Sequence, residues 1–202
     1  MGLIKDQIQE KTKKAGSKEA AIRDSKMWYQ KSLKNLNDKN IVKSSKAFVP
    51  GKIYVFRYVA PKTKETLEWW DMNPVVLALD PQGGNDVGIN LNLLPQKVKE
   101  TLLDDVYTRL YGQIKTNMTR ANENAGAQMN LSLTWDSAKK YLEKYNAAFA
   151  LRQYIPSIKA NQAIVSYEHW SDIVLCDFID LHGASVTGII NAFKKQYNNK
   201  NI

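Results

Sequence analysis

The sequence contains very few residues of the types that build disulfides, metal centres and nucleophilic sites. Its 202 residues include one cysteine, Cys176, and two histidines, His169 and His182. A single cysteine excludes an internal disulfide framework and is typical of a protein from a reducing compartment. Clustered metal ligands are missing as well, so we expect neither a metal ion nor a cofactor.

Long apolar runs are also absent. No stretch approaches the roughly 18 apolar residues that a membrane-spanning helix needs, and the first residues soon become charged, so we expect neither a membrane span nor a secretory signal. The hydrophobic and charged fractions, 44% and 24%, are those of ordinary globular domains. The sequence therefore predicts a soluble protein of the intracellular type that makes no membrane contact.

Recognisable catalytic motifs are lacking too. Neither histidine stands in a setting typical of a nucleophile and its base. His169, Asp172 and Cys176 recur at i, i+3 and i+7, which would share a helix face, but no second ligand cluster accompanies them. The pair Gly83-Gly84 is not followed by the Lys-Ser/Thr of a phosphate-binding loop and predicts a turn. We therefore expect no enzymatic activity and no catalytic residues.

Positive charge is abundant, and it lies at one end of the chain. The formal net charge is +9; residues 1–60 carry 14 basic and 5 acidic residues, whereas residues 61–202 carry 15 of each. A cationic segment attracts polyanions through counterion release, and nucleic acid is the leading candidate. A solvated basic helix, or a helix docked on an acidic neighbouring protein, would explain the same pattern.

Residues 1–47 predict a basic helical arm. Gly16-Ser17 interrupts the pattern, with Ser17 a plausible N-cap for a helix whose best window is 19–33. This window has a thin apolar stripe at helical spacing, formed by Ile22, Lys26, Tyr29 and Leu33. Upstream, Ile4 and Ile8 could face a partner. The stripe is too sparse for an independent core, so we expect the arm to lie on another surface.

Residues 48–94 are typical of short β-strands. The predicted strands, separated by turn-forming residues, cover 52–59, 67–70, 75–79 and 87–93. Four short strands in so small a region predict an antiparallel meander or SH3-like barrel at about 50–94. An open sheet covered by later helices is the alternative.

Residues 95–202 are predicted to be mainly helical. A helix from Pro95 should end at Gly112, and the Asn-rich stretch 113–132 should form a long loop. Thr134 is a plausible N-cap for a helix that runs to about Tyr154. A short strand at 158–165 and two closing helices, at 168–177 and 184–197, complete the chain. The predicted fold class is α+β, with the arm at 1–47 and one α+β domain at 48–202.

Aromatic residues are frequent in and before the strand region. Beside Lys52 and Arg57 they could stack on nucleic-acid bases, and the candidates are Trp28, Tyr54, Phe56, Tyr58, Trp69 and Trp70. Only one set of alternating side chains can face outward from a strand. The sequence therefore favours aromatics that fill the interior over a stacking platform.

Two longer segments within residues 48–111 resemble a known family. They read FVPGKIYVFRYVAPKTKETLEWWDMNPVVLAL and VGINLNLLPQKVKETLLDDVYTRLY. The shared features are a Gly-led strand, a Tyr followed by a P-K-T-K turn, an aromatic–Asp pair, a Pro-led strand and a G-x-N-x-x-x-L-P segment. They occur here at Gly51, 58–64, Trp70-Asp71, 74–79 and 88–95. This pattern is similar to a virion-associated structural protein family of large, contractile-tailed bacteriophages, whose members are often labelled DNA end protector proteins.

The resemblance implies a virion structural protein that binds without catalysis at the ends of packaged double-stranded DNA. It also implies a position in the head–neck or tail region, within a symmetric assembly that contains portal, neck, tail or baseplate proteins. Such a protein would be found in the virion, and in the host cytoplasm during assembly.

The basic arm would supply the phosphate contacts. The candidate residues are Lys11, Lys13, Lys14, Lys18, Arg23, Lys26, Lys31 and Lys34. Deletion of residues 1–47 is then predicted to abolish a salt-sensitive, sequence-independent affinity for DNA. The alternative is a purely architectural neck, baseplate or tail component without DNA affinity, which the apolar stripes of the arm favour. A Mg²⁺-dependent nuclease is the third hypothesis, and its only candidate ligands are Asp80, Asp86, Asp104 and Asp105.

Overall fold

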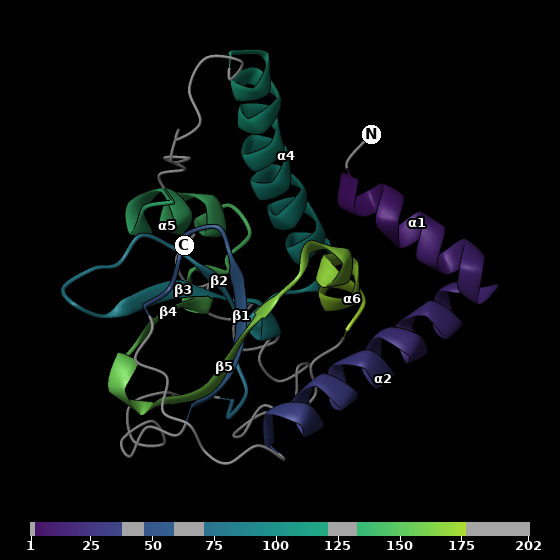
Figure 1. The fold of residues 1–202 in the computed structure, drawn as a ribbon, viewed down its shortest axis with the longest axis horizontal. Coiled ribbons are helices and arrows are strands. Elements are labelled where there is room, and N and C mark those ends of the chain that lie inside the picture. The colour runs from purple at the N-terminus through teal and green to yellow at the C-terminus, as the bar shows by residue number, and fades with distance from the viewer. Residues whose placement is uncertain (1–2, 38–46, 59–70, 121–132, 177–202) are drawn as a thin grey trace, which may run out of the picture.

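The protein folds around one antiparallel sheet that is flanked by helices (Figure 1). The computed structural model describes residues 3–37, 47–58, 71–120 and 133–176. Within these ranges the strands are β1 (Ile53–Tyr58), β2 (Val75–Ala78), β3 (Asp86–Asn90), β4 (Leu151–Tyr154) and β5 (Lys159–Val165). The mixture of helix and strand confirms the predicted α+β class.

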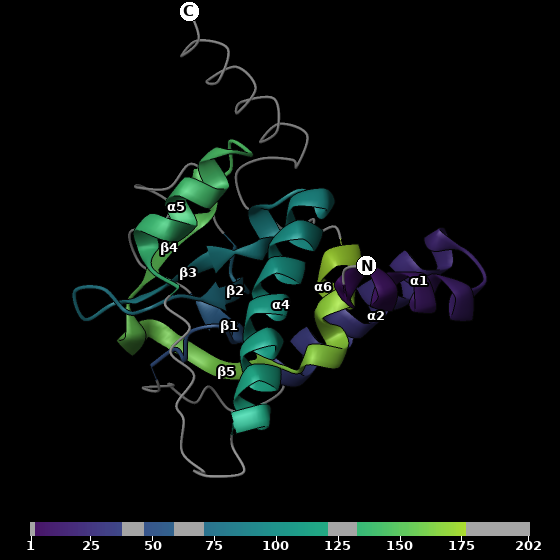
Figure 2. The same cartoon turned by 90° about the horizontal axis from the view of Figure 1, so that it is seen from above.

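The helices form a layer beside the sheet, with the chain's first two helices outermost (Figures 1 and 2). α2 contacts β1 and β5 of the sheet directly and packs against α6, while α1 packs on α2, α4 and α6. α5 lies at the opposite end, next to β3 and β4. The helix bounds are α1 (Leu3–Ala15), α2 (Lys18–Asn37), α4 (Gln96–Arg120), α5 (Trp135–Glu143) and α6 (Trp170–Leu175).

The sheet is open, with the strand order β4-β3-β2-β1-β5. The prediction of an SH3-like barrel is therefore wrong, and the alternative of an open sheet with helices packed on it is correct. The reason is that β4 and β5 extend the β1–β3 meander at opposite edges, β4 pairing with β3 and β5 with β1. Both come from the region predicted to be mainly helical, where only the strand at 158–165 was expected.

Side chains of the two central strands alternate between two buried clusters. Ile53 and Val55 of β1 belong to the large aliphatic core under the helices. The intervening Tyr54, Phe56 and Tyr58 belong to a second, aromatic cluster and are 3%, 0% and 9% exposed. This confirms that these three aromatics fill the interior. The predicted strand at 67–70, with Trp69 and Trp70, lies outside the described residues.

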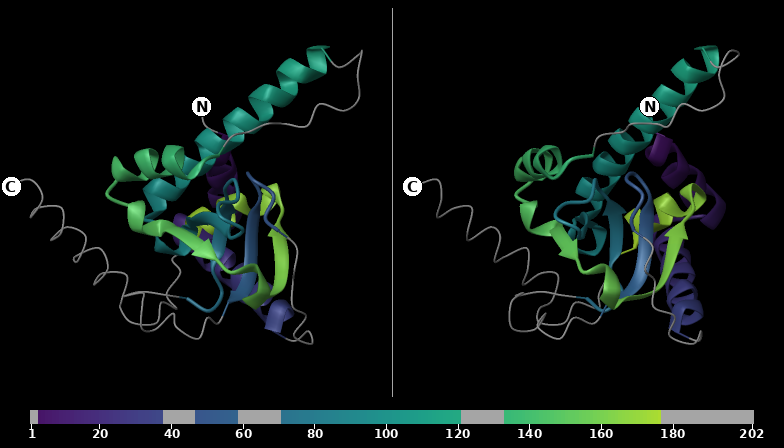
Figure 3. Two further views of the ribbon diagram at one scale, coloured as in Figure 1. Left: turned by 90° about the vertical axis from the view of Figure 1, so that its left-hand side faces the viewer. Right: turned by 60° about the vertical axis from the view of Figure 1, so that its left-hand side comes forward.

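α4 is longer than predicted. It continues through Gly112 to Arg120, so Gly112 does not end the helix and residues 113–120 are not a loop. A glycine inside a helix costs only about 1 kcal/mol, which neighbouring turns can offset. Figure 3 shows the second half of α4 extending beyond the sheet in both views. The rest of the predicted loop, 121–132, and the predicted helix at 184–197 lie outside the described residues.

α5 is shorter than predicted, although its N-cap is correct. The Thr134 side chain accepts a hydrogen bond from the Ser137 amide, as an N-cap does. The helix ends at Glu143 because Asn146 adopts a left-handed conformation with φ 54°, and the Ala147 amide bonds back to the Leu142 carbonyl. The chain then enters β4, so the predicted helix does not reach Tyr154.

A buried carboxylate, Asp71, organises the end of β3. Asn90 ends this strand by accepting a hydrogen bond from the Asn92 amide, which turns the chain into a short 3-10 segment in place of the predicted strand continuation to 93. The side-chain amides of Asn90 and Asn92 donate to Asp71 at 3.2 and 2.7 Å. Burial raises the pKa of Asp71 to about 6, although these hydrogen bonds act to lower it.

The raised pKa of Asp71 predicts a pH-dependent stability. Between about pH 4 and pH 6 the folded protein holds a proton that the unfolded chain has released, so the free energy of unfolding falls as pH rises through this range. The loss attributable to Asp71 should reach up to about 3 kcal/mol. Urea unfolding of the wild type and of Asp71→Asn, measured from acid to neutral pH, isolates this contribution because asparagine stays neutral. Parallel pH profiles for the two proteins would contradict the prediction.

Candidate nucleic-acid interface

The eight cationic residues predicted to contact DNA all lie on α1 and α2. Gly16 and Ser17 separate the two helices as predicted; Gly16 has φ 83°, and the Ser17 hydroxyl accepts a hydrogen bond from the Ala20 amide. Of the eight, Lys11 and Lys26 are half-buried, and six are exposed: Lys13, Lys14, Lys18, Arg23, Lys31 and Lys34. The structure thus brings the predicted residues onto two consecutive helices.

Both helices are held against the body of the same chain by polar contacts at their ends. The Ile4 amide at the start of α1 donates to Oδ1 of Asp104 on α4 at 2.6 Å, which places a carboxylate at the positive end of the helix dipole. At the end of α2, the Asn161 side chain donates to the Leu36 carbonyl at 2.5 Å. These contacts satisfy helix-terminal groups that would otherwise lack partners.

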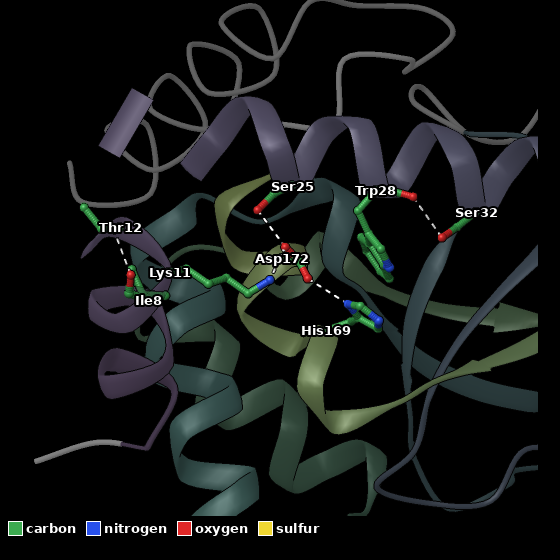
Figure 4. Close-up of polar contacts among 8 residues, drawn as sticks. All are labelled: Ile8, Lys11, Thr12, Ser25, Trp28, Ser32, His169 and Asp172. Atoms are coloured by element: carbon green, nitrogen blue, oxygen red, sulfur yellow. Dashed lines mark hydrogen bonds and ion pairs between the residues drawn. The ribbon is translucent and has the colours of Figure 1, made fainter. Parts of the chain in front are cut away.

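The buried carboxylate of Asp172 joins three helical segments (Figure 4). Its Oδ1 lies 2.5 Å from Nζ of Lys11 on α1 and accepts a hydrogen bond from the Ser25 hydroxyl on α2 at 2.8 Å. Its Oδ2 lies 2.8 Å from Nδ1 of His169, just before α6. Lys11 is therefore paired within the chain, and we do not count it among the DNA contacts proposed below.

Sequence reasoning missed this role of Asp172. The i, i+3 spacing of His169 and Asp172 was visible, but it was considered only as part of a metal site. Lys11 and Ser25 are remote in the sequence, and only the fold brings them to the same carboxylate. Within the described part of the chain, no group of three or more His, Cys, Asp or Glu side chains is placed to hold a metal ion.

Loss of the Asp172 carboxylate is expected to loosen both helices. Asp172→Ala would leave the buried Ser25 hydroxyl without its acceptor and Lys11 without its partner, at a cost of about 2–3 kcal/mol in the free energy of unfolding. Hydrogen exchange of the α1 amides should accelerate. Glu10→Ala, which breaks only the exposed Glu10–Lys14 pair, is the matched control and should have no measurable effect. Unchanged α1 protection in Asp172→Ala would contradict this role.

The apolar stripes of α1 and α2 pack against the core of the same chain. Ile4 is fully buried, and Ile8, Tyr29 and Leu33 pack against the large aliphatic core. These stripes were the feature that favoured a purely architectural protein, because they suggested contact with a partner. Since they are covered by the chain itself, they no longer support that alternative.

The solvent-facing surface of the docked helices α1 and α2 is predominantly basic. On α1 and α2 the exposed charges are seven basic residues and four acidic ones, Asp6, Glu10, Glu19 and Asp24. After Asp24, α2 contains Lys26, Lys31 and Lys34 and no carboxylate. The helices therefore pack on the body through one face and keep a cationic face towards solvent.

Two of the four carboxylates considered for a nuclease have structural contacts. Asp86 forms a buried ion pair with Lys159, and Asp104 accepts the Ile4 amide.

None of the helices described is both long enough and apolar enough to cross a bilayer.

Comparison with known proteins identifies the family of the chain. The family described as Phage T4 terminal DNA protecting protein matches residues 2–186, which include α1, α2 and every strand described above. No curated protein and no solved structure matches the chain. The family match agrees with the resemblance seen in the sequence, and it covers nearly the whole chain. The protein therefore belongs to the phage T4 terminal DNA protecting protein family.

Proposed function

We propose that the protein binds the ends of packaged phage DNA in the virion and protects them by covering them, without catalysis. The observation that carries the proposal is the cationic outer face of α1 and α2 in a member of a terminal DNA protecting family. Cationic side chains that contact phosphates release condensed counterions, so binding should be independent of sequence and should weaken steeply with salt.

The phosphate contacts are assigned to the six exposed residues and to half-buried Lys26. The exposed residues are Lys13, Lys14, Lys18, Arg23, Lys31 and Lys34. Docking of the helices supports this assignment, because a fixed face loses less conformational entropy on binding than a flexible tail does. Lys14 pairs with exposed Glu10, and such a pair is weak enough to exchange for a phosphate.

The position in the particle is part of the same proposal. As the resemblance of the sequence implies, we place the protein in the head–neck or tail region, in contact with portal, neck, tail or baseplate proteins of a symmetric assembly. It would be present in the virion and, during assembly, in the host cytoplasm.

Competition between linear and circular DNA tests the proposal. A labelled blunt-ended duplex is bound at low salt, and one plasmid is added either linearised or as a closed circle at equal mass. We expect the linear form to compete better and the bound duplex to resist an exonuclease. Absence of any duplex binding at low salt would overturn the proposal, and equal competition by circles would remove its end preference.

A further inference from the structure

A hollow lies between α2 and the sheet. It has a volume of about 270 Å³ and is bounded by α2, by β1, β2 and β5, and by the start of α6. Its floor is apolar and includes Val55, Val75 and Ile173. This volume is close to the lower end of the range for small-molecule sites, so it fits one planar ring system with its substituents.

One wall of the pocket is a pair of stacked rings. Trp28 of α2 and His169 lie with ring centroids 4.5 Å apart and 21° between their planes (Figure 4). Asp172 holds His169 by its Nδ1, and Nε2 makes no hydrogen bond with any residue that the structure describes. The wall is therefore aromatic, held in place from behind, and has a ring nitrogen available to a ligand.

The rim of the pocket offers further polar groups. Asn35 is exposed, and within the described part of the chain its side-chain amide has no hydrogen-bond partner. An amide supplies both donors and an acceptor, as the edge of a nucleobase requires. An apolar floor, an aromatic wall and a polar rim together suit a heterocyclic base.

On its α2 side, the charge beside the pocket is positive, whereas Glu168 lies on the opposite side next to His169. All five α2 residues that line it come from the acid-free half of the helix. Lys31 is exposed and lies one helical turn from both Trp28 and Asn35, so it is at the rim. A base in the pocket would thus have a cation near its phosphate.

We infer that this pocket holds a single unstacked nucleotide from the end of the DNA, with its base against the Trp28–His169 pair and its phosphate near Lys31. The inference rests on the proposed function, and it explains how the protein would prefer DNA ends to internal duplex. A terminal nucleotide leaves the stack at a lower cost than an internal one, whose removal breaks a base pair and two stacking contacts. A nucleotide within a continuous duplex or a circle would therefore enter this pocket only at a higher free-energy cost.

Substitutions in the pocket should reduce the preference for ends and spare general DNA binding. Trp28→Leu removes the aromatic wall, and Asn35→Ala removes a rim amide that makes no hydrogen bond within the described fold. For a duplex with one unpaired terminal nucleotide, Trp28→Leu should weaken binding on the order of 10-fold, as loss of one base–aromatic stack does. Affinity for circular DNA should stay unchanged. Met27→Ala is the matched control, since Met27 is adjacent and 55% exposed, and it does not line the pocket.

A fluorescent base analogue, 2-aminopurine, reports on the pocket directly. Placed at the terminal position, it should change its emission on binding to the wild type and to Met27→Ala, and much less with Trp28→Leu or Asn35→Ala. Placed internally, it should not respond. Equal weakening of linear and circular DNA by both pocket variants, or an unresponsive terminal probe, would overturn the inference while DNA binding itself stood.

If the wild type binds no duplex at all, the proposed function fails, and the pocket is then tested alone. A short single-stranded oligonucleotide is titrated while the indole resonance of Trp28, assigned by comparison with Trp28→Leu, is followed. A saturable shift of this resonance would support the nucleotide site. No shift would overturn it.

Discussion

Asp86→Asn is expected to lower the free energy of unfolding by about 3–5 kcal/mol. Asp86 and Lys159 form an ion pair in which the side chains are 2% and 0% exposed. The Lys159 ammonium also lies 4.2 Å from the centre of the Phe48 ring, and Asp86 accepts the Phe48 amide at 2.8 Å. Asparagine can still accept this amide, but it removes the carboxylate that neutralises the buried ammonium of Lys159. Chemical denaturation at neutral pH measures the loss.

A second substitution separates charge imbalance from loss of packing. Lys159→Met removes the buried cation and keeps an unbranched side chain, so the double variant should be more stable than Asp86→Asn alone. This recovery is expected because replacing both members of a buried pair avoids the desolvation of either. A double variant no more stable than the single one would show that the charge of Lys159 is not the cause.

Neutralising the cations of α2 is expected to reduce DNA affinity strongly. In the variant Arg23→Gln, Lys31→Gln, Lys34→Gln, three exposed positive charges are removed from the outer face of the helix without touching its packed face. If each makes one phosphate contact, the slope of log affinity against log salt should fall by about 2.7, since each contact contributes about 0.9. Affinity at low salt should fall on the order of 100-fold.

The matched control removes the same charge elsewhere. Lys139, Lys140 and Lys144 are exposed in and just after α5, which lies at the opposite end of the molecule from α2 (Figure 2). Their replacement by glutamine changes the net charge equally, so any general effect of charge on binding appears in both variants. Fluorescence anisotropy over a range of salt concentrations gives both slopes. Equal losses in the two variants would contradict a specific role for the α2 face.

Because α1 and α2 pack on the rest of the chain, deleting them tests DNA binding less directly than substituting their exposed residues does. Deletion of residues 1–47 was predicted to remove DNA binding, and it remains a prediction. Such a deletion would also remove Ile4 and Leu36 from the core. It would also remove Lys11 and Ser25, which contact Asp172 of α6. Loss of binding could then follow from loss of structure. Substitutions confined to the exposed face leave the packing intact and are therefore the better test. The division into an arm and one domain likewise remains a prediction.

Local features of this protein were determined by the sequence alone. β1, β2 and β5, the break at Gly16 and the cap at Thr134 are all found near their predicted positions. The concentration of positive charge before residue 60 is a property of composition and needs no fold. These features depend on neighbours a few residues away, and the sequence shows such neighbours directly.

Tertiary structure decided the features that depend on remote partners. Asp172 meets Lys11 and Ser25 across most of the chain, and Asp86 meets Lys159 across 73 residues. β4 and β5 reach opposite edges of the sheet, which keeps it open, and α4 continues through Gly112 against local expectation. Packing also determined which face of α1 and α2 is buried, and hence which cations remain available. The physical reason is that burial and pairing energies of several kcal/mol exceed local propensities, which amount to about 1 kcal/mol per residue or less.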